Sequence, residues 1–257
     1  MRRGLLVFIL LVPGLLWAES VDDIEAYRLK NGVWSGLSLT TGALNMTAPS
    51  ARSTIKLTAL PAVGLGIEQW VVDSLGVHLR GTVGLPATIS NVLGQDVGFT
   101  LHTAEAGLVF RHFWGLRASA PAWLVSSNLK MQIEDAQEQR PSVLVSRVIF
   151  SPTLKIGYER FLKPGQWWVR GYLGGAYPFF VRETPTDSGR PDHMVSGTVE
   201  VLSCYHLTPR WGVFTQIDAL YQSFDHGGEA TRAGGVRDVS TQDYYFTALI
   251  GIRFVDD

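Results

Sequence analysis

The residues of this chain that could perform acid–base or nucleophilic chemistry are few and scattered. Two histidines directly follow an aspartate, in Asp192–His193 and in Asp225–His226. Adjacent side chains of an extended chain point to opposite sides, so neither dipeptide forms a catalytic pair by itself. Ser196 lies three residues after His193, and a hydrolase would need such a serine and histidine brought together. Because this spacing is generic, the sequence assigns no catalytic residue.

Metal and phosphate sites are not predicted either. His102 and Glu105 are three residues apart, which places them on opposite faces of a strand. The single cysteine, Cys204, excludes a disulfide framework and a multi-cysteine zinc site. The glycine-rich stretches at 64–66 and 171–175 are not followed by the strand-to-helix turn of a phosphate-binding loop. We therefore expect no metal site and no cofactor.

A second set of polar residues follows a clearer pattern. Charged side chains occur one or two to a segment, on faces otherwise made of Gly, Thr, Ser and Ala. A strand face exposed to water normally carries many more charges, so this pattern is typical of a cramped polar interior. The expected interior charges are Lys56, Arg80, Glu105, Lys155, Glu159, Arg170, Glu200, Asp218 and Arg253. They would form either an ion-pair network that fills the interior or the constriction of a narrow pore.

The elements that must position these side chains are long β-strands. In STIKLTALPAVGLGIE, apolar residues recur at every second position from Ile55 to Ile67, and LGVHLRGTVGL repeats the pattern. An alternation of this length is a strong strand signal. Eight or twelve strands are the alternatives to the ten that we predict, over residues 33–41, 54–67, 75–86, 98–111, 116–126, 143–159, 167–182, 194–207, 212–224 and 243–255.

Irregularities are expected at three places in these strands. Pro61 and Pro152 cannot donate a ladder hydrogen bond and should lie at bulges or near strand ends. The apolar face of segment 98–111 changes between Leu101 and Ala104, which predicts a bulge there.

The N-terminus is typical of a secretory signal peptide. Arg2 and Arg3 precede an uncharged apolar run from Gly4 to Trp17, and cleavage is expected after Ala18. An uncleaved anchor is the alternative, but the run is shorter than the roughly 20 residues of a spanning helix. The expected parts are a signal peptide over 1–18, a short lead-in over 19–32 and one barrel domain over 33–257.

Aromatic residues gather near both ends of the predicted strands. Two aromatic belts one strand length apart match the two interfaces of a lipid bilayer. The residues assigned to these belts are Trp34, Trp70, Trp114, Trp167, Trp168, Trp211, Tyr177, Tyr221 and Tyr244. Connections after even-numbered strands are short, whereas those after odd-numbered strands, such as 42–53 and 127–142, are longer and polar. A soluble barrel with its apolar face inward is the alternative.

The chain closes on TALIGIRF, in which Phe246, Ile250, Ile252 and Phe254 share one face. With the signal peptide and the aromatic belts, this segment resembles the closing strand of bacterial outer-membrane β-barrel proteins. In that class the closing strand is the signal that the barrel-assembly machinery recognises. The resemblance implies an all-β fold, a closed antiparallel up-and-down transmembrane β-barrel, in a bacterial outer membrane. The resemblance also implies that the lead-in and the short connections face the periplasm.

Three functions remain open on the sequence. The favoured one is a small barrel with a structural or accessory envelope role, its interior largely filled by the ion-pair network. The alternatives are a narrow porin-like diffusion channel and an outer-membrane hydrolase with a site at the extracellular rim, although the paired-aspartate pattern of the omptin proteases is not found. Expected partners are outer-membrane lipid, the barrel-assembly machinery and other envelope proteins. A net charge of -1 gives no general attraction to nucleic acid.

Overall fold

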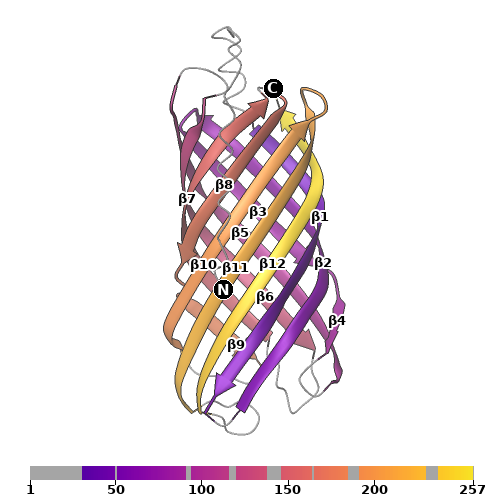
Figure 1. Cartoon of the computed structure of the whole chain (residues 1–257), viewed down its shortest axis with the longest axis vertical. Coiled ribbons are helices and arrows are strands. Elements are labelled where there is room, and N and C mark those ends of the chain that lie inside the picture. The colour runs from indigo at the N-terminus through magenta and orange to yellow at the C-terminus, as the bar shows by residue number, and fades with distance from the viewer. Residues whose placement is uncertain are drawn as a thin grey trace, which may run out of the picture.

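The last strand of the chain pairs with the first and closes the sheet into a barrel (Figure 1). In the computed structural model Leu37 lies opposite Ile250 and Thr41 lies opposite Phe246. The ring runs β1-β2-β3-β5-β6-β7-β8-β10-β11-β12 and returns to β1, with antiparallel pairing at every step. The predicted closed ten-strand antiparallel barrel is therefore confirmed. In hydrocarbon such closure leaves no unpaired sheet edge.

The structure describes residues 31–256 except 50, 91–93, 116–119, 138–145, 164, 185–190 and 230–236. The expected signal peptide and the lead-in as far as residue 30 lie outside the described residues. In the described part no helix is long and apolar enough to cross a membrane. The strands are β1 (Asn31–Ala48), β2 (Ala51–Val72), β3 (Leu75–Gly84), β4 (Ala87–Ser90), β5 (Asp96–Phe113), β6 (Ala122–Gln137), β7 (Ser146–Lys163), β8 (Trp167–Ala176), β9 (Phe180–Thr184), β10 (Pro191–His206), β11 (Trp211–Glu229) and β12 (Arg237–Asp256).

Two of the ten wall strands are interrupted, which accounts for the labels β4 and β9. The chain leaves the ladder at Leu85 and Pro86 between β3 and β4, and again around Pro178 between β8 and β9. Beyond these breaks β4 pairs with β5, and β9 pairs with β7. Proline has no N–H for the ladder, so both breaks have a local cause. Pro152 lies opposite the second break, where its carbonyl accepts from the Tyr177 N–H at 3.0 Å.

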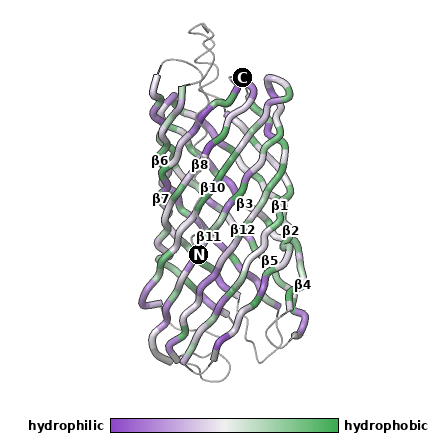
Figure 2. Tube along the Cα trace, in the orientation of Figure 1, coloured by the Kyte–Doolittle hydropathy of each residue, from purple (hydrophilic) through white to green (hydrophobic). Residues whose placement is uncertain are grey.

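The two ends of the barrel differ. We call the end that holds Asn31 and Asp256 the base, which is the upper end in Figure 1, and the opposite end the mouth. Exposed large apolar side chains cover the outer face near the base over about half the length of β12, from Ile252 to Tyr244. Toward the mouth the outer face becomes polar. In Figure 2 hydrophobic and hydrophilic residues alternate along the strands, as expected when each strand has one inward face.

The strands continue toward the mouth well past the apolar belt, which corrects the predicted long loops. The segment 42–53 was expected to be a loop, but only residues 49 and 50 separate β1 from β2. Most of 127–142 belongs to β6, which begins at Ala122 rather than near 116. Outward residues such as Asn45 and Thr47 are polar here, so the hydrophobic alternation stops while the ladder continues.

A bulge occurs in β2 and not in the predicted place. Between the pairs Thr40–Leu60 and Gly42–Leu57 the register shifts by one residue, and Ala59 has a φ of 55°. A positive φ is uncommon for a residue with a Cβ and is typical of such bulges. The bulge reverses the facing of β2 on its mouth side.

The bulge predicted in 98–111 is wrong. The ladder between β5 and β6 runs without a shift from Gly98 to Phe113. Phe99 and Leu101 point inward on the same face as Glu105. No bulge is needed because the interior near the mouth is partly apolar.

Candidate functional site

The candidate site is the barrel interior, where charged side chains from opposite walls meet. Three groups of polar residues follow one another from base to mouth. We call them the base layer (Glu68, Arg111, Glu159, Arg170 and Arg253), the central cluster (Arg80, Glu105, Lys130, Lys155, Glu200 and Asp218) and the mouth layer (Gln132, Glu134, Arg147, Gln222, Asp243 and Tyr245).

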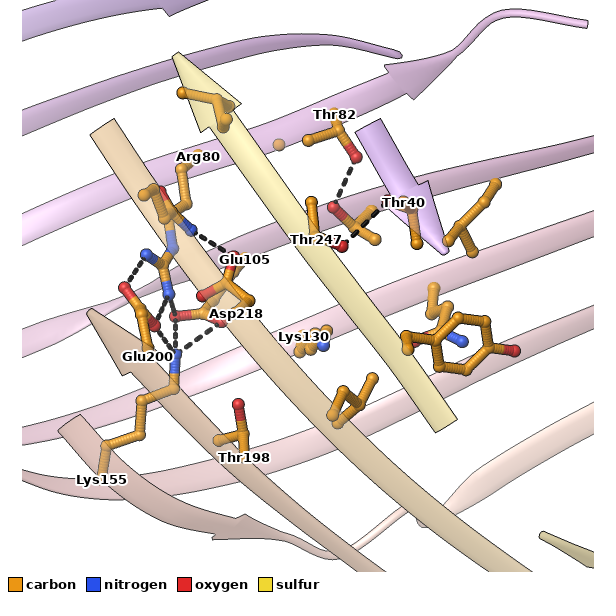
Figure 3. Close-up of a pocket in the computed structure, with 18 of the residues that line it drawn as sticks. Thr40, Arg80, Thr82, Glu105, Lys130, Lys155, Thr198, Glu200, Asp218 and Thr247 are labelled. Atoms are coloured by element: carbon orange, nitrogen blue, oxygen red, sulfur yellow. Dashed lines mark hydrogen bonds and ion pairs between the residues drawn. The ribbon is translucent and has the colours of Figure 1, made fainter. Parts of the chain in front are cut away.

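The central cluster is held by one arginine and one lysine that share two glutamates (Figure 3). The Arg80 Nη2 lies 2.8 Å from Glu105 Oε1 and 2.6 Å from Glu200 Oε2, and its Nη1 also donates to Glu200. The Lys155 Nζ lies 2.8 Å from Glu105 and 3.0 Å from Glu200. His78 approaches Glu105 at 3.3 Å. Two positive and two negative side chains therefore compensate one another in a site shielded from bulk water.

The contact between Arg80 and Glu200 crosses the full width of the lumen. Arg80 lies on β3 and Glu200 on β10, and four wall strands separate these two on either side of the ring. A side chain from each of two opposite walls therefore reaches the barrel axis.

The base layer closes the lumen in the same way. Arg170 on β8 lies 2.6 Å from Glu68 on the opposite strand β2, and 2.6 Å from Glu159 on its neighbour β7. The Arg111 guanidinium lies 3.6 Å from the centre of the Trp70 ring, within the range of a cation–π contact. Trp34 stacks on Phe214 at 5.0 Å between ring centroids. Large rings and paired guanidinium groups together fill this end.

The mouth layer contains a further buried network. Arg147 lies 2.6 Å from Glu134 and 2.6 Å from Asp243. The Tyr245 hydroxyl donates to Glu134, and Gln132 Nε2 donates to the same carboxylate at 2.7 Å. One glutamate thus accepts hydrogen bonds from three side chains.

Beside the mouth layer lies an apolar cluster built mainly from β2, β4 and β5. Its buried members are Leu44, Ile55, Leu57, Leu60, Ile89, Val97, Phe99, Leu101 and Tyr245. Backbone pairing between β2 and β3 ends at Ala62 and Gly84, and no ladder joins β4 to β2 in the described residues. The apolar cluster therefore closes by side-chain packing a part of the wall that lacks a continuous ladder.

Small cavities remain between the layers. One of about 90 Å³ lies between the central cluster and the mouth layer, and Figure 3 shows its lining residues. Two cavities of about 30 Å³ each lie on the base side of the central cluster and in the base layer. The 90 Å³ cavity and the small cavity next to the central cluster share Arg80 and Glu200 as lining residues. The two small cavities share Arg170 and Arg253. The cavities thus lie in series along the axis, separated by ion pairs.

No protein-family model and no curated protein sequence matches the chain. Solved structures of similar fold include the outer membrane protease OmpT from Escherichia coli, at 8% identity over 88% of this chain and 97% of that one, with a TM-score of 0.54. They also include the outer membrane protein OprG from Pseudomonas aeruginosa, at 12% identity over 89% and 96%, with a TM-score of 0.41. The chain has the fold of a bacterial outer-membrane β-barrel protein. At identities this low, the structural similarity shows the fold of this outer-membrane barrel but not its activity.

In this outer-membrane barrel, eight of the nine expected interior charges face the lumen; the exception is Lys56. Lys56 is exposed on the outer face, while its neighbours Ile55 and Leu57 are buried inside. The bulge at Ala59 is the cause, since it exchanges the two faces on the mouth side of β2. The alternation of the sequence continues through this point, so the exchange leaves no trace in it.

The aromatic residues of the outer-membrane barrel divide between lipid-facing and interior positions. Trp114, Trp167, Trp211, Tyr177, Tyr221 and Tyr244 lie on the outer face. Trp34, Trp70 and Trp168 were assigned to the interface but point inward and are at most 8% exposed. They sit on inward-facing positions of β1, β2 and β8, where large rings fill the base. Nearness to a turn does not decide which face a residue occupies.

Trp123 is an interface aromatic that sequence reasoning missed. It lies on the outer face at the base, with its ring 5.5 Å from Trp114 and 5.9 Å from Tyr158. The predicted strand began six residues too early and so moved Trp123 away from the end of the wall.

The closing strand of the outer-membrane barrel turns Phe246, Ile250, Ile252 and Phe254 outward. Phe254 contacts Trp211 at 5.0 Å between ring centroids. Tyr245, next to the belt residue Tyr244, points inward to Glu134.

The histidine and serine considered for catalysis do not come together. His193 is exposed on the outer face of β10, whereas Ser196 is buried on its inner face. His193 lies opposite Asp225 across the strands, but no ion pair joins them. Among the described residues no three His, Cys, Asp or Glu side chains form a group that could hold a metal ion.

Several interior residues were missed because their strand was predicted as a loop. Lys130 and Glu134 both lie on β6. The signal was present in the sequence, since Leu124, Ser126, Asn128, Lys130, Gln132 and Glu134 alternate with Trp123, Val125, Ser127, Leu129, Met131 and Ile133.

Proposed function

We propose that this protein is a bacterial outer-membrane barrel with a structural or accessory envelope role and a lumen that is closed at rest. The observation that carries the proposal is the Arg80–Glu200 contact between diametrically opposite strands. The Arg170–Glu68 contact repeats this arrangement at the base. An open diffusion channel needs a continuous passage, and both contacts lie across it.

Membrane insertion is supported by the outer face. Exposed apolar residues form a belt on the outer face. Aromatic pairs lie at its two borders: Trp211 with Phe254 at the base, and Tyr221 with Tyr244 toward the mouth. Aromatic pairs at both borders are typical of a barrel in contact with lipid. We infer that the base faces the periplasm, that lipid contacts the belt, and that β12 is the strand recognised by the barrel-assembly machinery.

A narrow channel is the second candidate. The three cavities in series favour it, because displacement of two arginine side chains would join them into one polar path. Arg80 and Arg170 would then be gating residues rather than purely structural ones.

Conductance in planar bilayers separates the two candidates. We expect the wild-type protein, refolded and shown to be folded by its SDS gel shift, to give no discrete conductance steps. The double variant Arg80→Ala, Arg170→Ala removes both barriers and should give steps. Arg182→Ala, on the outer face, is the matched control and should be silent. Regular steps from the wild-type protein would contradict the closed barrel, and an equally silent double variant would show that these ion pairs are not the barrier.

A further inference from the structure

Two charged groups that line the cavity of about 90 Å³ have no partner of opposite charge within ion-pair distance among the described residues. The Lys130 ammonium group forms no hydrogen bond and no ion pair with a described residue. Asp218 accepts a hydrogen bond from Gln216 Nε2 at 2.6 Å but has no cation within ion-pair distance. The remaining four charges of the central cluster pair with one another. An ammonium group and a carboxylate, neither of them in a direct ion pair, therefore line the same cavity.

These two groups come from well-separated walls of the barrel. Lys130 lies on β6 and Asp218 on β11, with three wall strands between them on one side of the ring and five on the other. Both side chains line the cavity, and Figure 3 shows them among its lining residues. A ligand that lies between them would meet a positive group on one side and a negative group on the other.

A third unsatisfied group points to a ligand independently of the charges. Gln216 is 8% exposed, lines the same cavity, and its Oε1 has no hydrogen-bond partner. A buried acceptor without a partner is unfavourable, so such groups normally have water or a ligand beside them. Gln216 Oε1 lies on the same side chain that binds Asp218, so both acceptors lie on β11.

The rest of the lining offers hydroxyl groups that are already engaged. Thr40 and Thr247 share a hydrogen bond of 2.9 Å, and Thr82 and Thr103 share another of 2.9 Å. They make the walls polar without competing for Lys130. The free hydrogen-bond donor is therefore the Lys130 ammonium group on β6, and the free acceptors lie on β11.

Charge balance selects the class of ligand. Three cations and three carboxylates belong to the central cluster, Arg80, Lys130 and Lys155 against Glu105, Glu200 and Asp218. A net anion or a net cation would unbalance a site that is shielded from water, which is unfavourable. A dipolar molecule without net charge avoids this. Its size is limited by the cavity volume of about 90 Å³.

We propose that this cavity binds a small zwitterion of the amino-acid class. Lys130 holds its carboxylate, while Asp218 and Gln216 Oε1 hold its ammonium group. The site goes beyond the proposed structural role, and it does not depend on whether the lumen conducts.

Glycine is the probe, because it is the smallest member of this class. The full-length mature protein is refolded in detergent with and without glycine, so that slow entry into a closed lumen does not matter. Folding is checked by the SDS gel shift, and binding is measured by the rise in thermal midpoint with glycine concentration. We expect a saturable rise for the wild-type protein. Lys130→Gln and Asp218→Asn should each weaken the apparent affinity at least about tenfold.

Two outer-face variants are the matched controls. Lys56→Gln and Asp225→Asn remove the same charges from exposed positions and should keep the wild-type affinity. Sodium acetate and methylammonium chloride each supply half of the zwitterion and should give no saturable rise. These two measurements need no variant, so they test the proposal even if a cavity variant does not fold. No response of the wild-type protein to glycine would show that the cavity holds water only and would overturn the site. Equal responses to glycine and acetate, or an unchanged affinity in Lys130→Gln, would also overturn it.

Discussion

At the scale of single residues, the contacts across the lumen have a different energetic weight from charges on the outer face. Glu200 is 1% exposed, and both of its cationic partners are also shielded from bulk water. Removing one member of a buried pair leaves an uncompensated charge, and this typically lowers stability by about 3–5 kcal/mol. An exposed charge contributes little, because water and salt screen it.

A double-mutant cycle on the central cluster follows from this difference. Arg80→Ala and Glu200→Ala should each lower the free energy of unfolding by roughly 3–5 kcal/mol, measured by urea unfolding in lipid vesicles. The double variant should lose clearly less than the sum, because Lys155 and Glu105 still pair and the charges balance again. Lys56→Ala, on the outer face, should stay within about 0.5 kcal/mol of wild type. Additive losses in the double variant would show that the two residues do not interact.

The tryptophan residues occupy two environments, the barrel interior and the lipid-facing outer face. Trp34, Trp70 and Trp168 fill the base from inside, whereas Trp211 is 50% exposed on the outer face. In variants that keep a single tryptophan, with the others replaced by Phe, brominated lipid should quench Trp211 strongly and Trp34 weakly. The reason is that bromine in the acyl chains reaches only rings on the lipid-facing side. Equal quenching of the two would place Trp34 at the lipid interface, as the sequence alone predicts.

At the scale of elements, the bulge in β2 decides which residues of its mouth half enter the lumen. Ala59 adopts a φ of 55°, a conformation that is unfavourable for a residue with a Cβ by roughly 1–2 kcal/mol. Glycine adopts it readily. We therefore expect Ala59→Gly to raise the free energy of unfolding by up to about 1 kcal/mol.

The matched control lies on the neighbouring strand. Ala43 pairs with Lys56, and its φ is negative, so Ala43→Gly should lower stability by roughly 0.5–1 kcal/mol. Opposite signs in urea unfolding are the expected result. If both substitutions lower stability alike, the positive φ at Ala59 is not a feature of the folded protein.

The strands and the bulge differ in how far sequence can predict them. The alternation from Pro61 to Ile67 reports a wall with one apolar face, and the structure places these residues outward. The same alternation extends back to Ile55, where the structure turns it inward. A glycine would have marked the positive φ, but the chain has Ala59 there. The interior charges were therefore largely predictable, whereas their partners and the reversal at Lys56 required the three-dimensional register.

At the scale of the whole molecule, the barrel is taller than its apolar belt. On β12 the outward residues change from apolar at Phe246 and Tyr244 to polar at Gln242 and Ser240, while pairing with β1 continues to Ser240. The closure of the barrel could be predicted from the two terminal strands. The part of the wall that projects beyond the belt could not be predicted, because a strand segment without apolar alternation looks like a loop in the sequence.

Adjacent positions on β12 can distinguish a wall from a loop. Gln242 is exposed on the outer face, whereas Thr241 is 4% exposed and points inward. In a Cys204→Ser background, Gln242→Cys should react quickly with a membrane-impermeant maleimide applied to intact expressing cells. Thr241→Cys should react slowly, because its side chain is enclosed by the barrel, and Ala248→Cys should be protected by lipid. All three should react after boiling in SDS. In a loop, residues 241 and 242 would both be accessible, so equal rates at these two positions would contradict a wall that projects beyond the membrane.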